Sequence, residues 1–325
     1  MLLNILFLFT GFVILIYGAD KLVDGGSALA SRLNVPNIVI GLTVVAFGTS
    51  APELVVNIIS SAKGESALAL GNVLGSNIFN ILAILGVTAA IYPIAVKKAT
   101  TWVEVPMTLF AAALIFITFC NDHWPVPDSY IISRTEGIIF LCFFLIFVTY
   151  TLVLARKGQG EEVTIKAYTL PKSILLIVIG LTGLIAGGQL LVKGAVSIAE
   201  SLGISQRIIA ITIISIGTSL PELATSLVAA RKKNVDMAIG NVVGSNLFNT
   251  FLILGTSAVI QPIPMSAENL TDILTNLLAT LLLFLFIFTG KGRQIEKWEG
   301  IVFLLLYLIY LFFLIFFFFS FLAQI

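Results

Sequence analysis

Long apolar runs separated by short polar segments form the main pattern of this chain. A helix needs about 20 apolar residues to span the hydrocarbon core of a bilayer. The first and sixth apolar runs are predicted to continue as amphipathic helices, to about Ser31 and Ser201. The pattern therefore predicts an all-α membrane protein with ten transmembrane helices, at residues 2–19, 36–62, 68–93, 101–120, 133–155, 171–190, 205–231, 236–261, 270–289 and 299–322.

The composition also indicates a membrane protein. Of 325 residues, 58% are hydrophobic and 11% are charged, whereas soluble domains carry about 25% charged residues. The lipid bilayer is therefore the expected surrounding of the chain. The net charge of +1 gives no basis for a nucleic-acid partner, and no feature indicates an obligate protein partner. The stretch before Lys21 has no basic residue, so it is predicted to be a first transmembrane helix and not a cleaved signal peptide.

Positive charges lie mainly on one side of the predicted helices. Lysine and arginine are concentrated in the loops that follow the odd-numbered helices. The other loops contain only Lys63, Arg134 and Arg207. Because cytoplasmic loops carry an excess of lysine and arginine, both termini are predicted to lie on the extracytoplasmic side of a cell membrane, either inner or plasma membrane.

An internal repeat divides the chain into two halves. The stretch GTSAPE at 48–53 recurs as GTSLPE at 217–222, which is 169 residues later, and nearly half of the positions in 41–86 match their counterparts in 210–255. Each half has five predicted helices, so the second half would enter the membrane from the opposite side. Secondary transporters built in this way bind their substrates near the membrane midplane, between the repeats. The predicted organisation is a five-helix repeat at 1–156, a short cytoplasmic linker at 157–170 and an inverted five-helix repeat at 171–325.

The repeated stretch places an acid, Glu53 or Glu222, deep inside an apolar segment of each half. A charged side chain at this depth costs at least ~2.5–3.5 kcal/mol on insertion scales. No lysine or arginine is expected at a similar depth, so either protonation or a bound cation must offset the charge. Two carboxylates balance the charge of one divalent ion, which favours the cation.

A proline directly before each acid is predicted to break its helix. Proline has no backbone N–H and disfavours helical geometry in the residue before it. The break would free backbone carbonyls for coordination, among them those of Ala46 and Ser215. Ca²⁺ takes about 6–8 oxygen ligands. Further oxygens could come from the hydroxyls of Thr49 and Thr218.

A polar stripe follows in the next predicted helix of each half, with a polar residue at every fourth position. Its candidate ligands, which are expected to face the broken helices, are Ser76, Asn80, Ser245 and Asn249. Hydrogen bonding between helices is the other role open to polar residues in membranes. That second role is favoured for Asn72, Asn77, Asn241 and Asn246.

These motifs resemble the calcium/cation antiporter superfamily, in particular its sodium/calcium exchanger family of the prokaryotic type, which lacks a regulatory domain. The resemblance is carried by GTSAPEL with GNVLGSNIFN and by GTSLPEL with GNVVGSNLFN. It implies that Ca²⁺ would be bound by Glu53, Glu222, Thr49 and Thr218. It implies that Na⁺ sites would share these groups and add Ser50, Ser76, Asn80, Ser219, Ser245 and the carbonyls of Ala46 and Ser215.

One candidate ligand, Asn249, departs from part of the family, because several relatives carry Asp at this position. The departure puts potassium dependence and a proton role at this position in doubt. Ca²⁺ and Na⁺ would be bound as transported substrates, and no cofactor is expected.

The resemblance implies a secondary active antiporter that exchanges Na⁺ for Ca²⁺ by alternating access, and not an enzyme. One alternative is a Ca²⁺/H⁺ antiporter that uses the same glutamates as proton carriers. A cation channel is less favoured, because channels usually need a symmetric pore with rings of charges or carbonyls. An intramembrane hydrolase lacks support, because no histidine or paired base accompanies Ser50 or Ser219.

Overall fold

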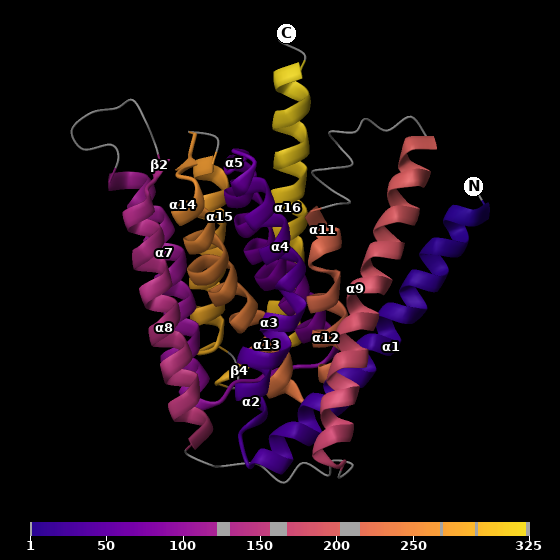
Figure 1. Ribbon diagram of the computed structural model, residues 1–325. Coiled ribbons are helices and arrows are strands. Elements are labelled where there is room, and N and C mark those ends of the chain that lie inside the picture. The colour runs from indigo at the N-terminus through magenta and orange to yellow at the C-terminus, as the bar shows by residue number, and fades with distance from the viewer. Residues whose placement is uncertain are drawn as a thin grey trace.

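The computed structural model of the protein describes residues 2–121, 131–156, 168–201, 215–266, 269–289 and 292–322. The described chain is almost entirely helical, with most helices running up or down along one common direction (Figure 1). Most of the predicted linker, residues 157–167, lies outside the described residues.

Several helices continue through short π-helical segments, which are labelled η. The helical elements of the first half are α1 (Leu2–Leu33), α2 (Asn37–Ile40), η1 (Gly41–Val45), α3 (Ala46–Thr49), α4 (Ala51–Ala62), α5 (Ala67–Ile78), η2 (Phe79–Leu85), α6 (Gly86–Ile91), η3 (Thr100–Glu104), α7 (Val105–Asn121) and α8 (Arg134–Arg156). Those of the second half are α9 (Leu170–Ser201), α11 (Ser215–Thr218), α12 (Leu220–Arg231), α13 (Val235–Leu247), η5 (Phe248–Leu254), α14 (Gly255–Ile260), α15 (Asn269–Phe286) and α16 (Lys297–Leu322).

The described residues contain eight helices that are long and apolar enough to cross a membrane. A ninth crossing is the pair 37–49 and 51–62, whose two parts are bent by 47° where they meet. The predicted span at 205–231 is only partly covered, because residues 205–214 lie outside the described residues. The chain is therefore a multi-pass helical membrane protein, and the tenth crossing stays a prediction.

The elements of the two halves correspond at the same spacing as the sequence repeat. The π-helical segments η2 and η5 begin at Phe79 and Phe248 and end at Leu85 and Leu254, in each case 169 residues apart. The sequence pattern predicted uninterrupted α-helices here, because a π-turn changes the hydrogen-bond ladder without changing which residues are apolar. Such π-helical turns occur frequently at functional sites.

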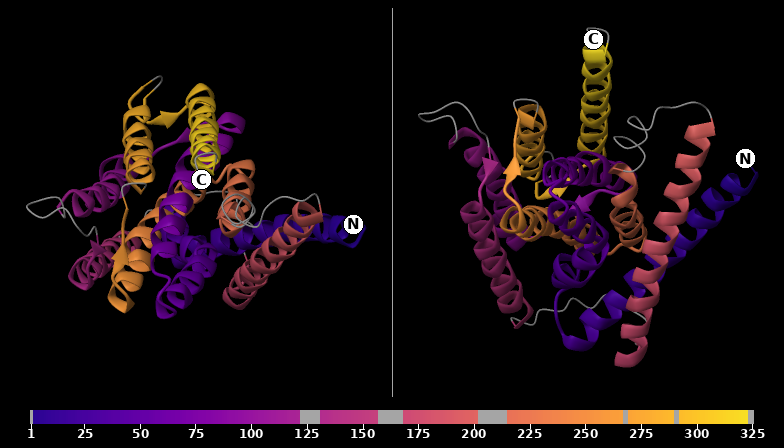
Figure 2. Two further views of the ribbon diagram at one scale, coloured as in Figure 1. Left: turned by 90° about the horizontal axis from the view of Figure 1, so that it is seen from above. Right: turned by 45° about the horizontal axis from the view of Figure 1, so that its top comes forward.

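The long helices α1 and α9 lie side by side at one edge of the molecule and also contact α12 (Figures 1 and 2). They run antiparallel, because Gly11 contacts Leu191 while Gly25 contacts Ser173. Their backbones touch at glycines: an added Cβ at Gly18 would lie 2.7 Å from the Leu184 nitrogen. This pair therefore packs with its backbones in direct contact at the glycines.

The interior of the bundle is formed by α5 with η2 and α13 with η5. Nearly every side chain of α13 and η5 is buried, which places these elements at the centre of the molecule. Two short antiparallel sheets join the halves: β1 (Ile94–Ala95) pairs with β4 (Gln294–Ile295), and β2 (Ile131–Ile132) pairs with β3 (Ile263–Pro264). Each sheet takes one strand from each half, so the halves are interlocked around the buried helices.

Candidate cation-binding site

The candidate site lies where two helices break, one in each half. Ser50 separates α3 from α4 with φ −85° and ψ 2°, and Ser219 separates α11 from α12 with φ −94° and ψ 7°. In both cases the proline of the repeated motif occupies the first turn of the following helix. Because proline has no N–H, the helical ladder cannot continue unbroken across this point.

Glu53 and Glu222 follow these breaks, in the first turns of α4 and α12, and are only 2% and 1% exposed. Each carboxylate accepts a hydrogen bond from the serine of the other half. Ser50 Oγ donates to Glu222 Oε1 at 3.0 Å, and Ser219 Oγ lies 3.5 Å from Glu53 Oε1. The site is therefore built jointly by the two halves, and the two acids face the same interior region.

The second oxygen of each carboxylate is buried and has no hydrogen-bond partner. This holds for Glu53 Oε2 and Glu222 Oε2, and the ion pairs of the described chain involve neither acid. A helix N-terminus favours negative charge by only about 0.3–1 kcal/mol, far less than the cost of burying a carboxylate without a partner. The two unpartnered oxygens are therefore available to coordinate a cation.

Two amide oxygens complete the same pattern. Asn80 Nδ2 donates to Asn246 Oδ1 at 2.9 Å, and Asn249 Nδ2 donates to Asn77 Oδ1 at 3.1 Å. The oxygens Asn80 Oδ1 and Asn249 Oδ1 are buried and without a hydrogen-bond partner. In each of these amides the NH₂ group is bonded to the opposite half, and the oxygen has no hydrogen-bond partner.

Hydroxyl groups surround the carboxylates. Thr49 Oγ1 lies 3.2 Å from Asn241 Oδ1, and Ser76 Oγ lies 3.2 Å from Ser219 Oγ. Ser245 is fully buried and lies against Glu222. Thr218 is partly buried at the end of α11. The structure thus gathers hydroxyl oxygens from both halves around the two acids.

The backbone carbonyls differ from what the sequence suggested. Ala46 was expected to have a freed carbonyl, but its oxygen accepts hydrogen bonds from the Ser50 N–H at 2.9 Å and from Thr49 Oγ1 at 3.3 Å. The reason is that the helical turn continues as far as Ser50, one residue beyond the end of α3. Ser215 begins α11, directly after residues that lie outside the described chain.

Glu104 is a further buried acid, which the sequence pattern did not single out although it lies near the start of a predicted span. It lies in η3, is 1% exposed, and accepts a hydrogen bond from Tyr150 Oη of α8 at 2.5 Å. Its other oxygen, Oε2, is buried and has no hydrogen-bond partner. Glu104 is thus a separate polar contact between η3 and α8, outside the two helix breaks.

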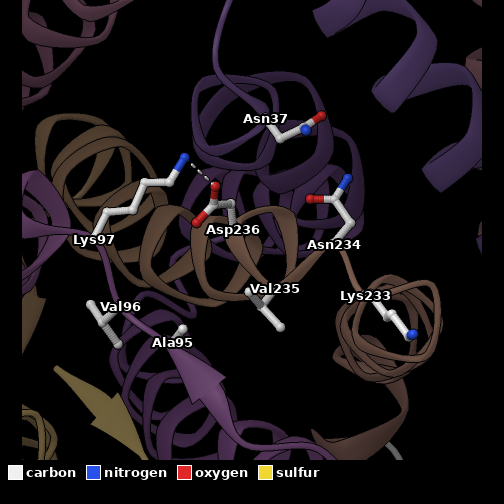
Figure 3. Close-up of a pocket in the computed structure, with 8 residues that line it drawn as sticks. All are labelled: Asn37, Ala95, Val96, Lys97, Lys233, Asn234, Val235 and Asp236. Atoms are coloured by element: carbon white, nitrogen blue, oxygen red, sulfur yellow. Dashed lines mark ion pairs between the residues drawn. The ribbon is translucent and has the colours of Figure 1, made fainter. Parts of the chain in front are cut away.

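A pocket of about 300 Å³ opens at the beginnings of α2 and α13, away from the candidate ligands. Figure 3 shows Lys97 and Asp236 joined on one side of it by an ion pair of 2.7 Å, with Asn37 and Asn234 on the other. None of the predicted cation ligands lines this pocket.

The oxygens at the helix breaks suit a hard cation. Carboxylate, hydroxyl and amide oxygens are the ligands that Ca²⁺ prefers, and two carboxylates neutralise one divalent ion. No group of three or more His, Cys, Asp or Glu side chains that could hold a metal occurs among the described residues.

Comparisons with known proteins agree with this chemistry. A family model described as sodium/calcium exchanger protein matches residues 3–153 and again 172–316, and the starts of the two matches are offset by the length of the internal repeat. The putative antiporter CaxA of Alkalimonas amylolytica is 38% identical over 317 residues, which cover 94% of this chain and 97% of the relative.

One further relative and one solved structure are also sodium/calcium exchangers. The sodium/calcium exchanger MaX1 of Methanosarcina acetivorans is 32% identical over 338 residues, covering 94% of this chain and 96% of the relative. A solved structure of the sodium-calcium exchanger NCX_Mj, soaked with Na⁺ and Ca²⁺, superposes with a TM-score of 0.79 at 34% identity. That match covers 95% of this chain and 97% of the other.

Proposed function

Because the chain belongs to the sodium/calcium exchanger family, we propose that it is a secondary active antiporter that exchanges Na⁺ for Ca²⁺ across the membrane. The observation that carries the proposal is the pair of buried carboxylates, each contacted by the opposite half and each left with one unpartnered oxygen. The relatives described above are named as antiporters and exchangers, which makes a transporter, and not an enzyme, the function that fits.

The proposed architecture is ten transmembrane helices in two inverted five-helix repeats, at 1–156 and 171–325, joined by the linker 157–170. Three observations support it. The elements from α3 to α6 correspond to those from α11 to α14, with their ends at a spacing of 169 residues, and the first helices of the halves, α1 and α9, run antiparallel. The beginning of α1 and the end of α16 lie at the same end of the molecule, which requires an even number of crossings (Figure 1).

The proposed substrates are bound at the helix breaks. Ca²⁺ would be held by Glu53 and Glu222 with Thr49 and Thr218, and Na⁺ would compete for the same carboxylates. Further oxygens would come from Ser50, Ser76, Asn80, Ser219, Ser245, Asn249 and the carbonyls of Ala46 and Ser215. The Ala46 carbonyl would have to give up or share its present hydrogen bonds, which makes it the weakest of these ligands.

Alternating access follows from the electrostatics of the site. Two buried carboxylates without a cation would be costly to carry through the apolar interior, so the empty site would not change sides readily. Sliding of the α1 and α9 pair over the bundle would open the site to one side or the other. By the positive-inside rule, both termini would lie on the extracytoplasmic side of a cell membrane.

The test is uptake of radioactive Ca²⁺ into proteoliposomes with an imposed Na⁺, K⁺ or H⁺ gradient. Uptake that saturates and requires internal Na⁺ is the expected result. Uptake driven by a pH gradient in the absence of Na⁺ would instead identify a Ca²⁺/H⁺ antiporter. Flux that needs no counter-ion would contradict exchange altogether.

A further inference from the structure

Two asparagines outside the proposed ligand set contact the amides within it. Asn77 accepts from Asn249 Nδ2, and Asn246 accepts from Asn80 Nδ2, so each contact joins one half to the other. All four side chains are at most 2% exposed. Water therefore cannot replace either contact.

These contacts decide which end of each ligand amide faces the site. An asparagine amide carries an oxygen acceptor on one side and an NH₂ donor on the other, and the two ends can exchange by rotation. With its NH₂ bound to the opposite half, Asn249 presents its oxygen to the site. The rotated amide would bring two oxygens together and would point a positively polarised NH₂ at the cation.

Each of the contacting asparagines has a further hydrogen-bond partner of its own. Asn246 Nδ2 donates to the backbone carbonyl of Asn77 at 3.4 Å, and Asn77 Nδ2 donates to Thr250 Oγ1 at 3.1 Å. A carbonyl can only accept, so the oxygen of Asn246 must turn toward Asn80. The hydrogen bond from Asn77 to Thr250 has no counterpart for Asn246. The residue that corresponds to Thr250 in the first half is Ile81, which has no hydroxyl.

We propose that Asn77 and Asn246 are positioning residues that orient the amides of Asn249 and Asn80 so that their oxygens face the transported cation. The inference rests on the proposed function, because it assumes that Asn80 and Asn249 bind the ion. It assigns to Asn77 and Asn246 a role in ion affinity and not only in helix association.

A double-mutant cycle on Asn77 and Asn249 tests this role. Asn77→Leu removes the amide but keeps the backbone carbonyl that anchors Asn246. We expect it to raise the KM for Ca²⁺ about five- to tenfold with little change in kcat, because one ligand oxygen loses its orientation. In an Asn249→Ala background the same change should raise KM less than about twofold, since the amide on which it acts is gone.

A second pair of variants keeps the test informative if Asn77→Leu fails to fold. Thr250→Val removes the anchor of Asn77 and should raise KM, whereas Thr250→Ser keeps a hydroxyl and should leave it near the wild-type value. Effects of Asn77→Leu and Asn249→Ala that simply multiply, or equal KM values for the two Thr250 variants, would overturn the inference. Absence of Na⁺-driven uptake by the wild-type protein would overturn the proposed function as well.

A second inference comes from ion pairs that occur in one half of the repeat and not in the other. Lys232, in the turn between α12 and α13, lies 2.6 Å from Asp20 Oδ1 and 2.6 Å from Asp24 Oδ1, both on α1. Its Nζ also donates to the backbone carbonyl of Asp20 at 3.0 Å. Beside it, Asn234 Nδ2 donates to Ser27 Oγ of α1 at 2.9 Å. This end of α1 is therefore tied to the second half by charge as well as by packing.

The opposite half cannot form the same ties. Lys63 occupies the repeat position of Lys232, but Gln189 and Lys193 stand at the positions of Asp20 and Asp24. The pair of Lys97 and Asp236 is likewise replaced there, by Ser266 and Ala67. The halves are nearly identical at the carboxylates, so this difference distinguishes one face of the molecule from the other.

The backbone is also tightly packed near these ties. An added Cβ at Gly240 of α13 would lie 2.9 Å from the Ile38 carbonyl oxygen of α2 and 3.2 Å from Gly41 Cα of η1. We infer that Lys232 with Asp20 and Asp24 is a latch that holds α1 against the second half, and that it must release before α1 can move away from this face.

The latch is tested by the accessibility of α1. Ala30, which is 1% exposed and shares a buried cluster with Ala229 and Ala230, is changed to cysteine in a protein with Cys120→Ser and Cys142→Ser. A membrane-impermeant thiol reagent on the face of Lys232 should label this position about two- to fivefold faster in Lys232→Gln than without that change.

Lys63→Gln is the matched control, because it removes the equivalent lysine from the half that has no ion pair. It should leave the labelling rate unchanged. Equal rates in the parent, Lys232→Gln and Lys63→Gln proteins, or an equal rise in both variants, would overturn the latch. Asp24→Asn provides a second route to the same measurement and should also raise the rate.

Discussion

At the scale of single residues, the site combines full burial with incomplete hydrogen bonding. Glu53 and Glu222 each have one oxygen satisfied by a serine of the opposite half and one oxygen left over. Buried polar groups are generally paired, so each leftover oxygen needs an explanation. Glu104 also keeps one unpartnered oxygen, but it lies in η3 and is bound by the Tyr150 hydroxyl of α8, not by a serine at a helix break.

This contrast gives a prediction for charge removal. Glu53→Gln and Glu222→Gln should each lower Ca²⁺ uptake about 100-fold or more, because one of two buried charges that balance the ion is lost. Both proteins should still insert and purify, since the glutamine oxygen can accept from the same serine. Uptake of radioactive Ca²⁺ into proteoliposomes is the measurement. Glu104→Gln is the control and should retain most transport; normal flux in either site variant would show that these carboxylates do not hold Ca²⁺.

At the scale of elements, the apolar pattern predicted most helices because burial in lipid demands long apolar runs and internally satisfied backbones. The amphipathic continuations of α1 and α9 were also predicted from Asp20, Lys193 and their neighbours. The π-helical segments were not, since they leave the pattern unchanged. The hydrogen bonds of Asn77 and Asn246 could not be assigned either, because they depend on how two halves far apart in sequence dock together.

The contact between α1 and α9 gives a prediction at this scale. At Gly187 an added Cβ would lie 2.5 Å from the Leu15 nitrogen, whereas at Gly188 the nearest atom is Leu15 Cδ1 at 3.9 Å. Gly187→Ala should therefore push the helices apart, destabilise the protein by about 1–3 kcal/mol and slow exchange.

Gly188→Ala is the matched control on the same helix turn. It adds the same methyl group at an ordinary van der Waals distance from Leu15 and also favours the helix, so stability and exchange should be unchanged or slightly improved. Thermal unfolding in detergent and initial rates of Ca²⁺ uptake would measure both effects. Equal behaviour of the two variants would mean that close backbone contact is not what joins α1 to α9.

At the scale of the whole molecule, the two halves depend on each other. Each two-stranded sheet takes one strand from each half, α1 packs on α9, and each carboxylate is held by a serine across the centre. Neither half can complete the site or cover its own buried helices. The ion pairs around Lys232 occur in one half and not in the other, which gives the repeated architecture two unequal faces.

This mutual dependence predicts how the chain behaves when it is divided. Residues 1–156 and 171–325, expressed together as separate chains, should copurify and support Na⁺-driven Ca²⁺ uptake, because the contacts between them do not need the linker. Either piece alone should give no uptake, since it supplies only one of the two carboxylates. A chain divided within α8, at Phe144, is the control and should assemble poorly, because a transmembrane helix cut at its middle leaves unsatisfied backbone groups in lipid. Uptake by one half alone, or failure of the divided halves to associate while the control assembles, would contradict a site shared between two interlocked repeats.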